Sequence, residues 1–189
     1  ERGTYIFNSK DLCMIEHMDD ILTSGIDSLK IEGRMKTALY VATVARTYRK
    51  AIDDYLEDPA KYQANMSWYQ EQIAGCTYRK FTTGFFYGKP GEESQIYDNN
   101  TYEKGYTYLG FAEVVDERGY VQITQRNKFT VGESIEIMKP DGTNLLVPVK
   151  AIYDEEGNSV ESAPHPQQKL FVDLGGGAEV YDILRRSEA

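Results

Sequence analysis

Apolar positions follow a helical period in the first part of the chain and a strand period in the second. Over residues 37–56 they recur at intervals of three, four and seven, and this stripe predicts an amphipathic helix. Asp58 and Pro59 supply an N-cap and a first helical residue, so a second helix is expected to follow and to end at Gly75. Upstream, residues 9–25 predict a helix that begins with a serine cap and stops at a glycine.

Short stretches at 3–8 and 27–33 predict strands that alternate with these helices. The resulting order is strand, helix, strand, helix, helix, as at the end of a repeating βα protein. Such units are too few to close an eight-stranded barrel. We therefore expect residues 1–80 to be the last βα units of an incomplete TIM-like barrel with a helical extension.

From about residue 106 the pattern alternates with a period of two, and turn signals separate the short apolar runs. The turn signals lie at 117–119, 140–142 and 156–158. Short strands at this spacing predict a small antiparallel β-barrel or sandwich. Residues 81–189 are thus expected to form a linker and an all-β domain, which makes the fold class of the whole chain α+β.

The predicted strand at 27–33 and the residues after it carry an unusual charged face. Lys30, Glu32 and Arg34 occupy every second position, and Leu29 and Ile31 lie between them. In a barrel strand the charged side chains would face the interior, where unpaired charge is costly. The C-terminal ends of barrel strands also build active sites. These three residues are therefore candidate catalytic residues; the alternative is a structural Lys–Glu–Arg ion network.

The net charge of −9 argues against a free-standing nucleic-acid binder, but it leaves room for a local basic patch. Arg79, Lys80, Arg126 and Lys128 are the candidates for such an RNA-facing patch. No apolar run approaches the roughly 20 residues of a membrane span, so no membrane partner is expected. Two cysteines do not make a disulfide framework, which favours a cytoplasmic location.

Cys13 is placed by this pattern in the first turn of the helix predicted after Ser9. A helix N-terminus favours the thiolate, and a thiolate is both a nucleophile and a metal ligand. A lone cysteine among apolar neighbours is also commonly a small buried hydrophobe. Both interpretations remain open from spacing alone.

The tracts NSKDLC and GIDSLKIEGRMK, in this order, resemble the collagenase-like peptidase family U32, and especially its branch of tRNA hydroxylation proteins. The tract RKFTTGFFYGKP and the β-rich tail are similar to that family's C-terminal domain. The resemblance implies that this chain is the C-terminal part of a longer protein with a barrel-like N-terminal portion. It also implies a tail like the small barrels of translation elongation factors.

The same resemblance implies a role in RNA hydroxylation, at the wobble uridine of tRNA or at a cytidine of ribosomal RNA. It further implies an iron–sulfur cluster held by cysteines of the full-length parent, to which Cys13 would supply one ligand. The chain alone is then expected to hold no cluster.

Two other functions are compatible with the residues. A peptidase, as the family name suggests, would need Cys13 to work with His17, which can share one helical face with it. A non-catalytic binding or assembly module would describe the β-rich tail by itself.

Overall fold

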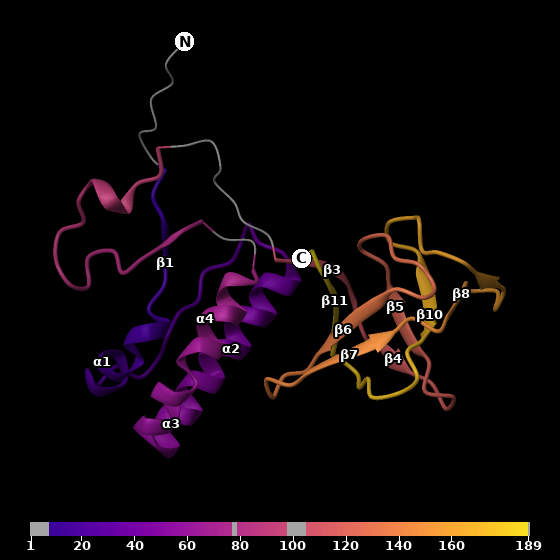
Figure 1. Ribbon diagram of the computed structural model, residues 1–189, viewed down its shortest axis with the longest axis horizontal. Helices are drawn as coiled ribbons and strands as arrows, with labels where there is room; N and C mark the ends of the chain where they lie inside the picture. The colour runs from indigo at the N-terminus through magenta and orange to yellow at the C-terminus, as the bar shows by residue number, and fades with distance from the viewer. Residues whose placement is uncertain (1–7, 77–78, 98–104, 189) are drawn as a thin grey trace, which may run out of the picture. The chain divides into compact units, whose positions relative to one another are not determined.

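The computed structural model describes residues 8–76, 79–97 and 105–188 (Figure 1). The chain divides into two compact units, Glu1–Lys104 and Gly105–Ala189, which we call the first and the second unit and describe separately. Helices and strands are both present, which confirms the α+β class. The segment 81–97, which the sequence pattern grouped with a linker, contributes a strand to the first unit.

The first unit is built mainly from helices, with a short parallel strand pair. Its elements are β1 (Asp11–Leu12), the 3₁₀ helix η1 (Ile15–His17), α1 (Met18–Thr23), α2 (Ala38–Glu57), α3 (Pro59–Ala64), α4 (Met66–Ala74), β2 (Phe81–Thr82) and the 3₁₀ helix η2 (Glu92–Ser94). None of the helices in the described residues is both long and apolar enough to cross a lipid bilayer.

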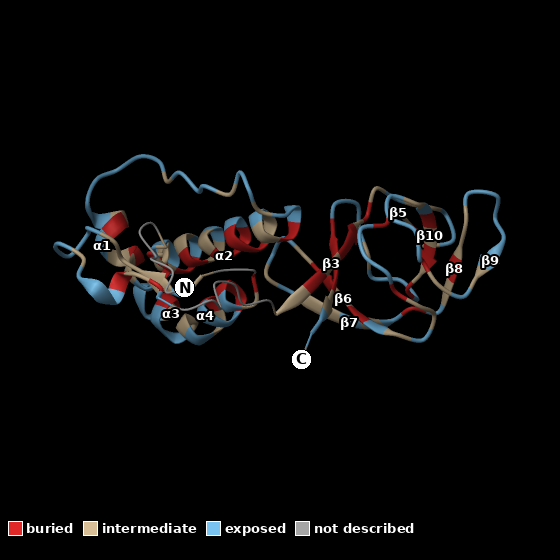
Figure 2. Cartoon of the chain, turned by 90° about the horizontal axis from the view of Figure 1, so that it is seen from above, coloured by how far each residue is buried: buried red, intermediate tan, exposed pale blue. Residues whose placement is uncertain are grey.

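Helix α2 confirms the amphipathic helix expected from the apolar stripe. The Thr37 side chain caps it by accepting a hydrogen bond from the Tyr40 N–H at 3.2 Å. Buried residues lie along one side of the helix and exposed residues along the other (Figure 2). Val44 and its neighbours in the stripe pack into the core of the first unit, whereas Val41, predicted to lie on the same stripe, is 44% exposed.

The second predicted helix begins as expected, because the Asp58 side chain accepts a hydrogen bond from the Ala60 N–H at 2.9 Å. It is nevertheless two helices, since the chain breaks at Asn65 between α3 and α4. The Asn65 side chain donates to the buried carboxylate of Asp54 at 2.9 Å. The apolar pattern gave no sign of this break.

Two local predictions at the start of the chain need correction. The helix predicted for residues 9–25 is present only from Ile15 onward: Ser9 bridges Gln95 and β1 follows it, whereas η1 and α1 are helical and Gly25 follows them at φ +82°. Residues 26–33 lie outside regular structure, and within the described residues they pair with no strand. Alternation predicts which side chains share a face, but a strand also needs a partner backbone. The strand predicted at 3–8 lies almost wholly outside the described residues.

Strands β1 and β2 form a parallel pair, with Asp11 opposite Phe81 and Leu12 opposite Thr82. The pairing continues on both sides, because the Asp11 N–H donates to the Lys80 carbonyl at 2.9 Å and the Cys13 N–H to the Thr82 carbonyl at 3.0 Å. Parallel pairing is the arrangement that a βα protein requires. A remnant of a TIM-like barrel nonetheless stays a prediction.

The second unit consists of antiparallel sheets around one apolar core, as the period of two predicted. A five-stranded sheet has the order β4-β5-β10-β8-β9, and a four-stranded sheet has the order β3-β11-β6-β7. The strands are β3 (Tyr106–Phe111), β4 (Val114–Val115), β5 (Val121–Thr124), β6 (Ser134–Met138), β7 (Asn144–Pro148), β8 (Ala151–Tyr153), β9 (Ser159–Val160), β10 (Lys169–Asp173) and β11 (Ile183–Ser187).

The turns predicted in this unit are confirmed, with glycines at positive φ at Gly119, Gly142 and Gly157. Aspartates fix the turns: Asp116 and Asp154 each accept backbone hydrogen bonds within them. The strands belong to two sheets, and closure into a single barrel stays a prediction.

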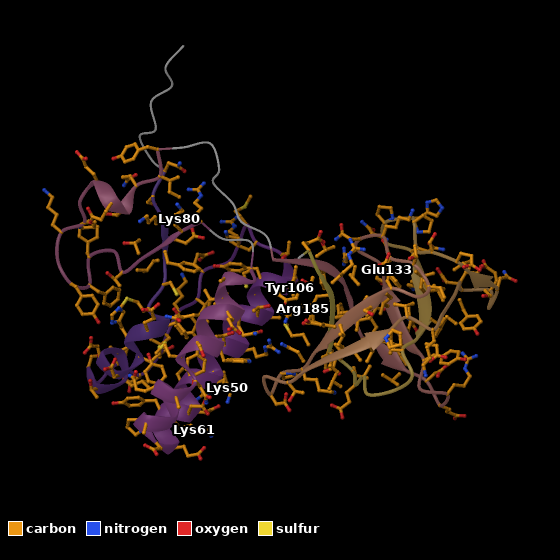
Figure 3. The ribbon with its side chains drawn as sticks, viewed as in Figure 1. Lys50, Lys61, Lys80, Tyr106, Glu133 and Arg185 are labelled. Atoms are coloured by element: carbon orange, nitrogen blue, oxygen red, sulfur yellow. The ribbon has the colours of Figure 1, made fainter. Side chains whose placement is uncertain are left out.

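A buried carboxylate ties three of the helices together. Asp54 on α2 is 3% exposed and accepts hydrogen bonds from the Tyr69 hydroxyl at 2.6 Å and from Asn65. The ammonium groups of Lys50 and Lys61 lie 3.0 and 3.1 Å from its oxygens (Figure 3). Burial opposes ionisation, but the hydrogen bonds from these partners outweigh it and hold the pKa of Asp54 below its usual range.

Replacing Asp54 by Asn should lower the free energy of unfolding at pH 7 by about 2 kcal/mol. This loss is smaller than the loss expected on breaking a fully buried ion pair, because both lysines stay partly exposed. The folded-state pKa of Asp54 is depressed, so its contribution is present above the unfolded-state value of about 4 and is lost as the pH falls below it. Urea unfolding at pH 7 and pH 3 should therefore show the difference between mutant and wild type shrinking in acid.

The neighbouring Asp53 gives a matched control. Its side chain is 61% exposed and pairs with Arg49 on the surface, so Asp53→Asn should stay within about 1 kcal/mol of the wild type. Equal stability of both variants at pH 7 would contradict the role assigned to Asp54.

Candidate functional site

A pocket of about 350 Å³ lies beside β1 in the first unit, and we call it the Lys30 pocket. Its walls come from β1, the segment between α1 and α2, and the first turns of α2. The lining residues are Asp11, Leu12, Met14, Ile21, Leu29, Lys30, Ile31, Glu32, Lys36, Tyr40, Val44, Tyr48 and Phe86. The volume is within the range of small-molecule sites, and carboxylates, ammonium groups and phenols meet on an apolar background.

The three charged residues of the predicted strand are placed differently from one another. Lys30 and Glu32 line the pocket, and Arg34 does not. The Glu32 carboxylate accepts a hydrogen bond from the backbone N–H of Arg34 at 2.9 Å. Within the described residues no ion pair joins these three side chains, so the alternative of a Lys–Glu–Arg network finds no support. All three are exposed, which leaves Lys30 and Glu32 accessible to a ligand.

The position of the pocket depends on Asp11, which the sequence pattern did not single out. Its carboxylate accepts a hydrogen bond from the Arg79 N–H at 3.1 Å, and the Lys36 ammonium lies 3.4 Å away. Lys36 also lies over the Tyr40 ring, 5.0 Å from its centre. Asp11 thus joins β1 to the segment before β2 and to the start of α2.

Tyr40 stays neutral in this setting. Burial, followed by the negative charge of Asp11, raises the pKa of Tyr40 to about 12. A neutral phenol can donate a hydrogen bond to a bound oxygen, and Lys30 and Lys36 can neutralise an anionic group. The pocket is therefore chemically suited to a ligand that carries a carboxylate or phosphate.

Cys13 lies between β1 and η1 and not in a helical turn. Its sulfur is 3.6 Å from the Tyr48 hydroxyl, which accepts a hydrogen bond from the Met14 N–H at 2.9 Å. Burial raises the pKa of the Cys13 thiol and outweighs the hydrogen bonds from the Ile15 backbone and from Tyr48, which lower it. In this structure the thiol is thus the stable form at neutral pH.

Cys13 also lines a second pocket of about 370 Å³, together with Glu16, His17 and residues of α4 and β2. His17 is not its partner there: its ring packs against Tyr87 with centres 4.8 Å apart. No hydrogen bond joins Cys13 to His17 in the part of the chain that the structure describes. A raised thiol pKa and the absence of a paired base both disfavour a Cys–His nucleophile.

Family models match both units of the chain. The model of peptidase family U32 matches residues 1–96, and that of the U32 C-terminal domain matches residues 104–185. The chain belongs to peptidase family U32. The boundary between the two matches lies close to the division between the two units.

Several curated relatives resemble the U32 chain along its whole length. The tRNA hydroxylation protein P1 of Bacillus subtilis is 38% identical over 100% of the chain and 44% of the relative. The tRNA hydroxylation protein P of Escherichia coli is 35% identical over 99% of the chain and 41% of the relative. A collagenase of Porphyromonas gingivalis is 31% identical over 87% and 40%. The chain thus spans less than half the length of these relatives.

A solved structure also resembles part of the U32 chain. It is the C-terminal domain of a Geobacillus thermoleovorans protein described as a U32 peptidase. The likeness covers 43% of this chain and 92% of that domain, with 28% identity and a TM-score of 0.39.

The predicted RNA-facing residues lie in both units. Arg79 and Lys80 directly precede β2 in the first unit, and Lys80 is exposed (Figure 3). Arg126 and Lys128 are exposed in the loop after β5 of the second unit. Each pair is local, and a single patch made of all four stays a prediction.

A metal cluster would need more ligands than Cys13. The described residues contain no group of three or more His, Cys, Asp or Glu side chains arranged to hold a metal ion. Cys13 is partly exposed and lines a pocket, so it is accessible as one ligand. Cys13 therefore has the exposure that one cluster ligand needs, and its role in a cluster stays a prediction.

Sequence reasoning missed Asp11, Lys36 and Tyr40. Lys36 continues the alternation of charges at 30, 32 and 34, and this was the available signal. Asp11 lies two residues before Cys13, but nothing in its spacing reveals contacts with residues as distant as Lys36 and Arg79.

The raised pKa of the Cys13 thiol can be tested by alkylation. In a Cys76→Ser chain, where Cys13 is the remaining cysteine, iodoacetamide should react slowly at pH 7. The rate should rise with pH up to and beyond the ordinary thiol value of 9.0. The thiolate is the reacting form, and burial keeps its fraction low. A rate at pH 7 above that of a small thiol would contradict this and would favour a nucleophilic cysteine.

Proposed function

We propose that this chain is the C-terminal part of a longer U32 protein that acts in tRNA hydroxylation, at the wobble uridine. One observation carries the proposal. Curated proteins named for tRNA hydroxylation, from Bacillus subtilis, Escherichia coli and Haemophilus influenzae, match 99–100% of the chain through both units. The match is not confined to a shared barrel fragment or to the β-rich tail.

The Lys30 pocket supports a role in this chemistry. Lys30 would hold a carboxylate or phosphate of a substrate, because an ammonium on an anionic oxygen forms a strong charge-assisted hydrogen bond. Glu32, next to it on the pocket wall, would orient the substrate or exchange a proton. Arg34 lies outside the pocket wall and would contact a more distant phosphate of the RNA.

Other parts of the proposal concern the longer protein. We propose that the first unit completes a TIM-like barrel and that Cys13 supplies one ligand to an iron–sulfur cluster. The second unit would position the RNA, with Arg126 and Lys128 on phosphates. Phosphate contacts of this kind orient a protein on nucleic acid without reading its sequence.

A ribosomal RNA substrate and a peptidase activity are the competing functions. The collagenase relative is the observation in favour of proteolysis. Against it, Cys13 contacts Tyr48 and burial raises the pKa of its thiol. We therefore rank proteolysis below RNA modification.

A deletion strain tests the proposal. Mass spectrometry of tRNA nucleosides should show hydroxylated uridine lost on deletion and restored by the full-length gene. Lys30→Ala should lower the restored level by about tenfold or more, as expected for a lost charged hydrogen bond. Cys13→Ser should abolish both the modification and any iron–sulfur absorbance of the purified protein.

The control is Leu146→Ala, which removes an exposed apolar side chain of β7 and should restore the modification fully. Unchanged tRNA in the deletion strain would refute the proposal. A change confined to ribosomal RNA would favour the other RNA substrate.

A further inference from the structure

The loop after β2 presents aromatic side chains to solvent. Phe85 is 78% exposed and Phe86 is 61% exposed. Gly84 and Gly88 bracket them with φ of +58° and +140°, values that favour glycine. Large apolar side chains at such exposure are informative where they gather in one place.

Hydrogen bonds and a ring contact hold the backbone of this loop in place. The Tyr87 hydroxyl donates to Asp20 on α1, and its ring packs against His17. The Phe86 N–H donates to the Thr83 carbonyl at 3.3 Å. Tyr87 therefore anchors the loop, while the two phenylalanine rings stay outside on a defined backbone.

The exposed rings form one wall of a groove of about 650 Å³, which we call the Phe85 groove. Its lining residues are Ser9, Lys10, Leu12, Thr82, Gly84, Phe85, Phe86, Pro90, Gly91, Ser94 and Gln95. Leu12 and Phe86 also line the Lys30 pocket, so these two residues separate the groove from the candidate site. A ligand that extends beyond the pocket would therefore reach the groove next.

Another residue that lines the groove carries a polar atom without a partner. The Gln95 Oε1 is buried, and among the described residues it has no hydrogen-bond partner. The Gln95 backbone is fixed by its bridge to Ser9 and by its N–H, which donates to Glu92. An unpaired acceptor is costly, but this one is closed to solvent, so a ligand's N–H group would pair with it only after the Gln95 side chain turns toward the groove.

Charged side chains contribute less to the lining of the groove than aromatic and polar ones do. Lys10 lines the groove and lies near the carboxyl of Glu93. The pKa of that carboxyl is lowered mainly by backbone hydrogen bonds, first that of Gly91, and to a lesser extent by the charge of Lys10. The favourable contacts left for a ligand are an aromatic face, a hydrogen-bond acceptor and a single ammonium.

We propose that the Phe85 groove binds one unstacked nucleobase of single-stranded RNA, from the nucleotide next to the one whose phosphate Lys30 holds. The base would stack on Phe85, and one of its N–H groups would donate to the Gln95 Oε1. The assignment rests on the proposed RNA substrate and adds a second binding position to it. Enzymes that modify a base take it out of the stack, and contacts to flanking nucleotides then set their selectivity.

A nucleobase fits these contacts better than an apolar side chain does. Stacking on an aromatic ring is available to every base, and base edges carry N–H donors. An apolar protein segment would cover the rings but would leave the Gln95 acceptor unpaired. The Lys10 ammonium is placed for the adjacent phosphate.

The test uses the full-length protein and fluorescein-labelled anticodon stem–loop RNA, in a set where each loop base is removed in turn. Fluorescence anisotropy should show that Phe85→Ala weakens binding on the order of tenfold, the loss expected for one stacked base. Removing one particular loop base should weaken wild-type binding to the same extent. That removal should have no further effect in Phe85→Ala, because both changes delete the same contact.

Matched variants separate stacking from burial. Phe85→Trp should keep the wild-type affinity, and Phe85→Leu, which retains apolar surface without a ring face, should bind as weakly as Phe85→Ala. Leu146→Ala, an exposed apolar change in the second unit, should bind normally.

Wild-type affinity in Phe85→Ala would overturn the inference. The same result is expected if another part of the full-length protein covers the groove, and the inference would be wrong in that case too. Wild-type affinity in Phe85→Leu would overturn it too, because apolar surface without a ring face would then be enough for RNA binding. If the full-length gene restores hydroxylated uridine while Phe85→Ala binds RNA normally, the inference fails and the proposed function stands.

Discussion

The parallel backbone pairing of β1 with β2 joins segments that are far apart in the sequence, and the candidate sites of the first unit are arranged around it. Leu12 lines both the Lys30 pocket and the Phe85 groove, and Thr82 lines both the groove and the pocket at Cys13. Asp11 locks the pair by accepting the Arg79 N–H while it holds Lys36. Without this pairing the three cavities would lose their shared wall.

This arrangement places different chemistry on different sides of one short strand. Asp11 belongs to the Lys30 pocket, with its ammonium groups and the neutral phenol of Tyr40. Cys13, two residues on, belongs to the neighbouring pocket, and the loop after β2 carries Phe85 and Phe86 into the groove. A substrate of several nucleotides is the kind of ligand that such adjoining cavities would accommodate, which agrees with the proposed role in tRNA hydroxylation.

Periodic features of the sequence predicted much of the fold, and long-range contacts account for what was missed. The stripe of α2, the cap at Asp58 and the glycine turns of the second unit depend on neighbouring residues, so they were readable. Asn65, where α3 and α4 separate, contacts a buried carboxylate eleven residues away, and no local pattern reveals that contact. Lys30 and Glu32 were singled out as candidates because they alternate with apolar residues, whereas Asp11 acquires its contacts only when β1 meets β2.

Amide hydrogen exchange at β1 tests the central claim most directly. The Asp11 and Cys13 N–H groups donate to carbonyls next to and within β2, so they should exchange slowly, with protection like that of the amides in the middle of α2. Asp11→Ala should reduce the protection of both amides together and leave α2 protected. Exchange of these two amides at the rate of an unstructured peptide in the wild-type protein, with α2 still protected, would show that the pairing does not organise the site.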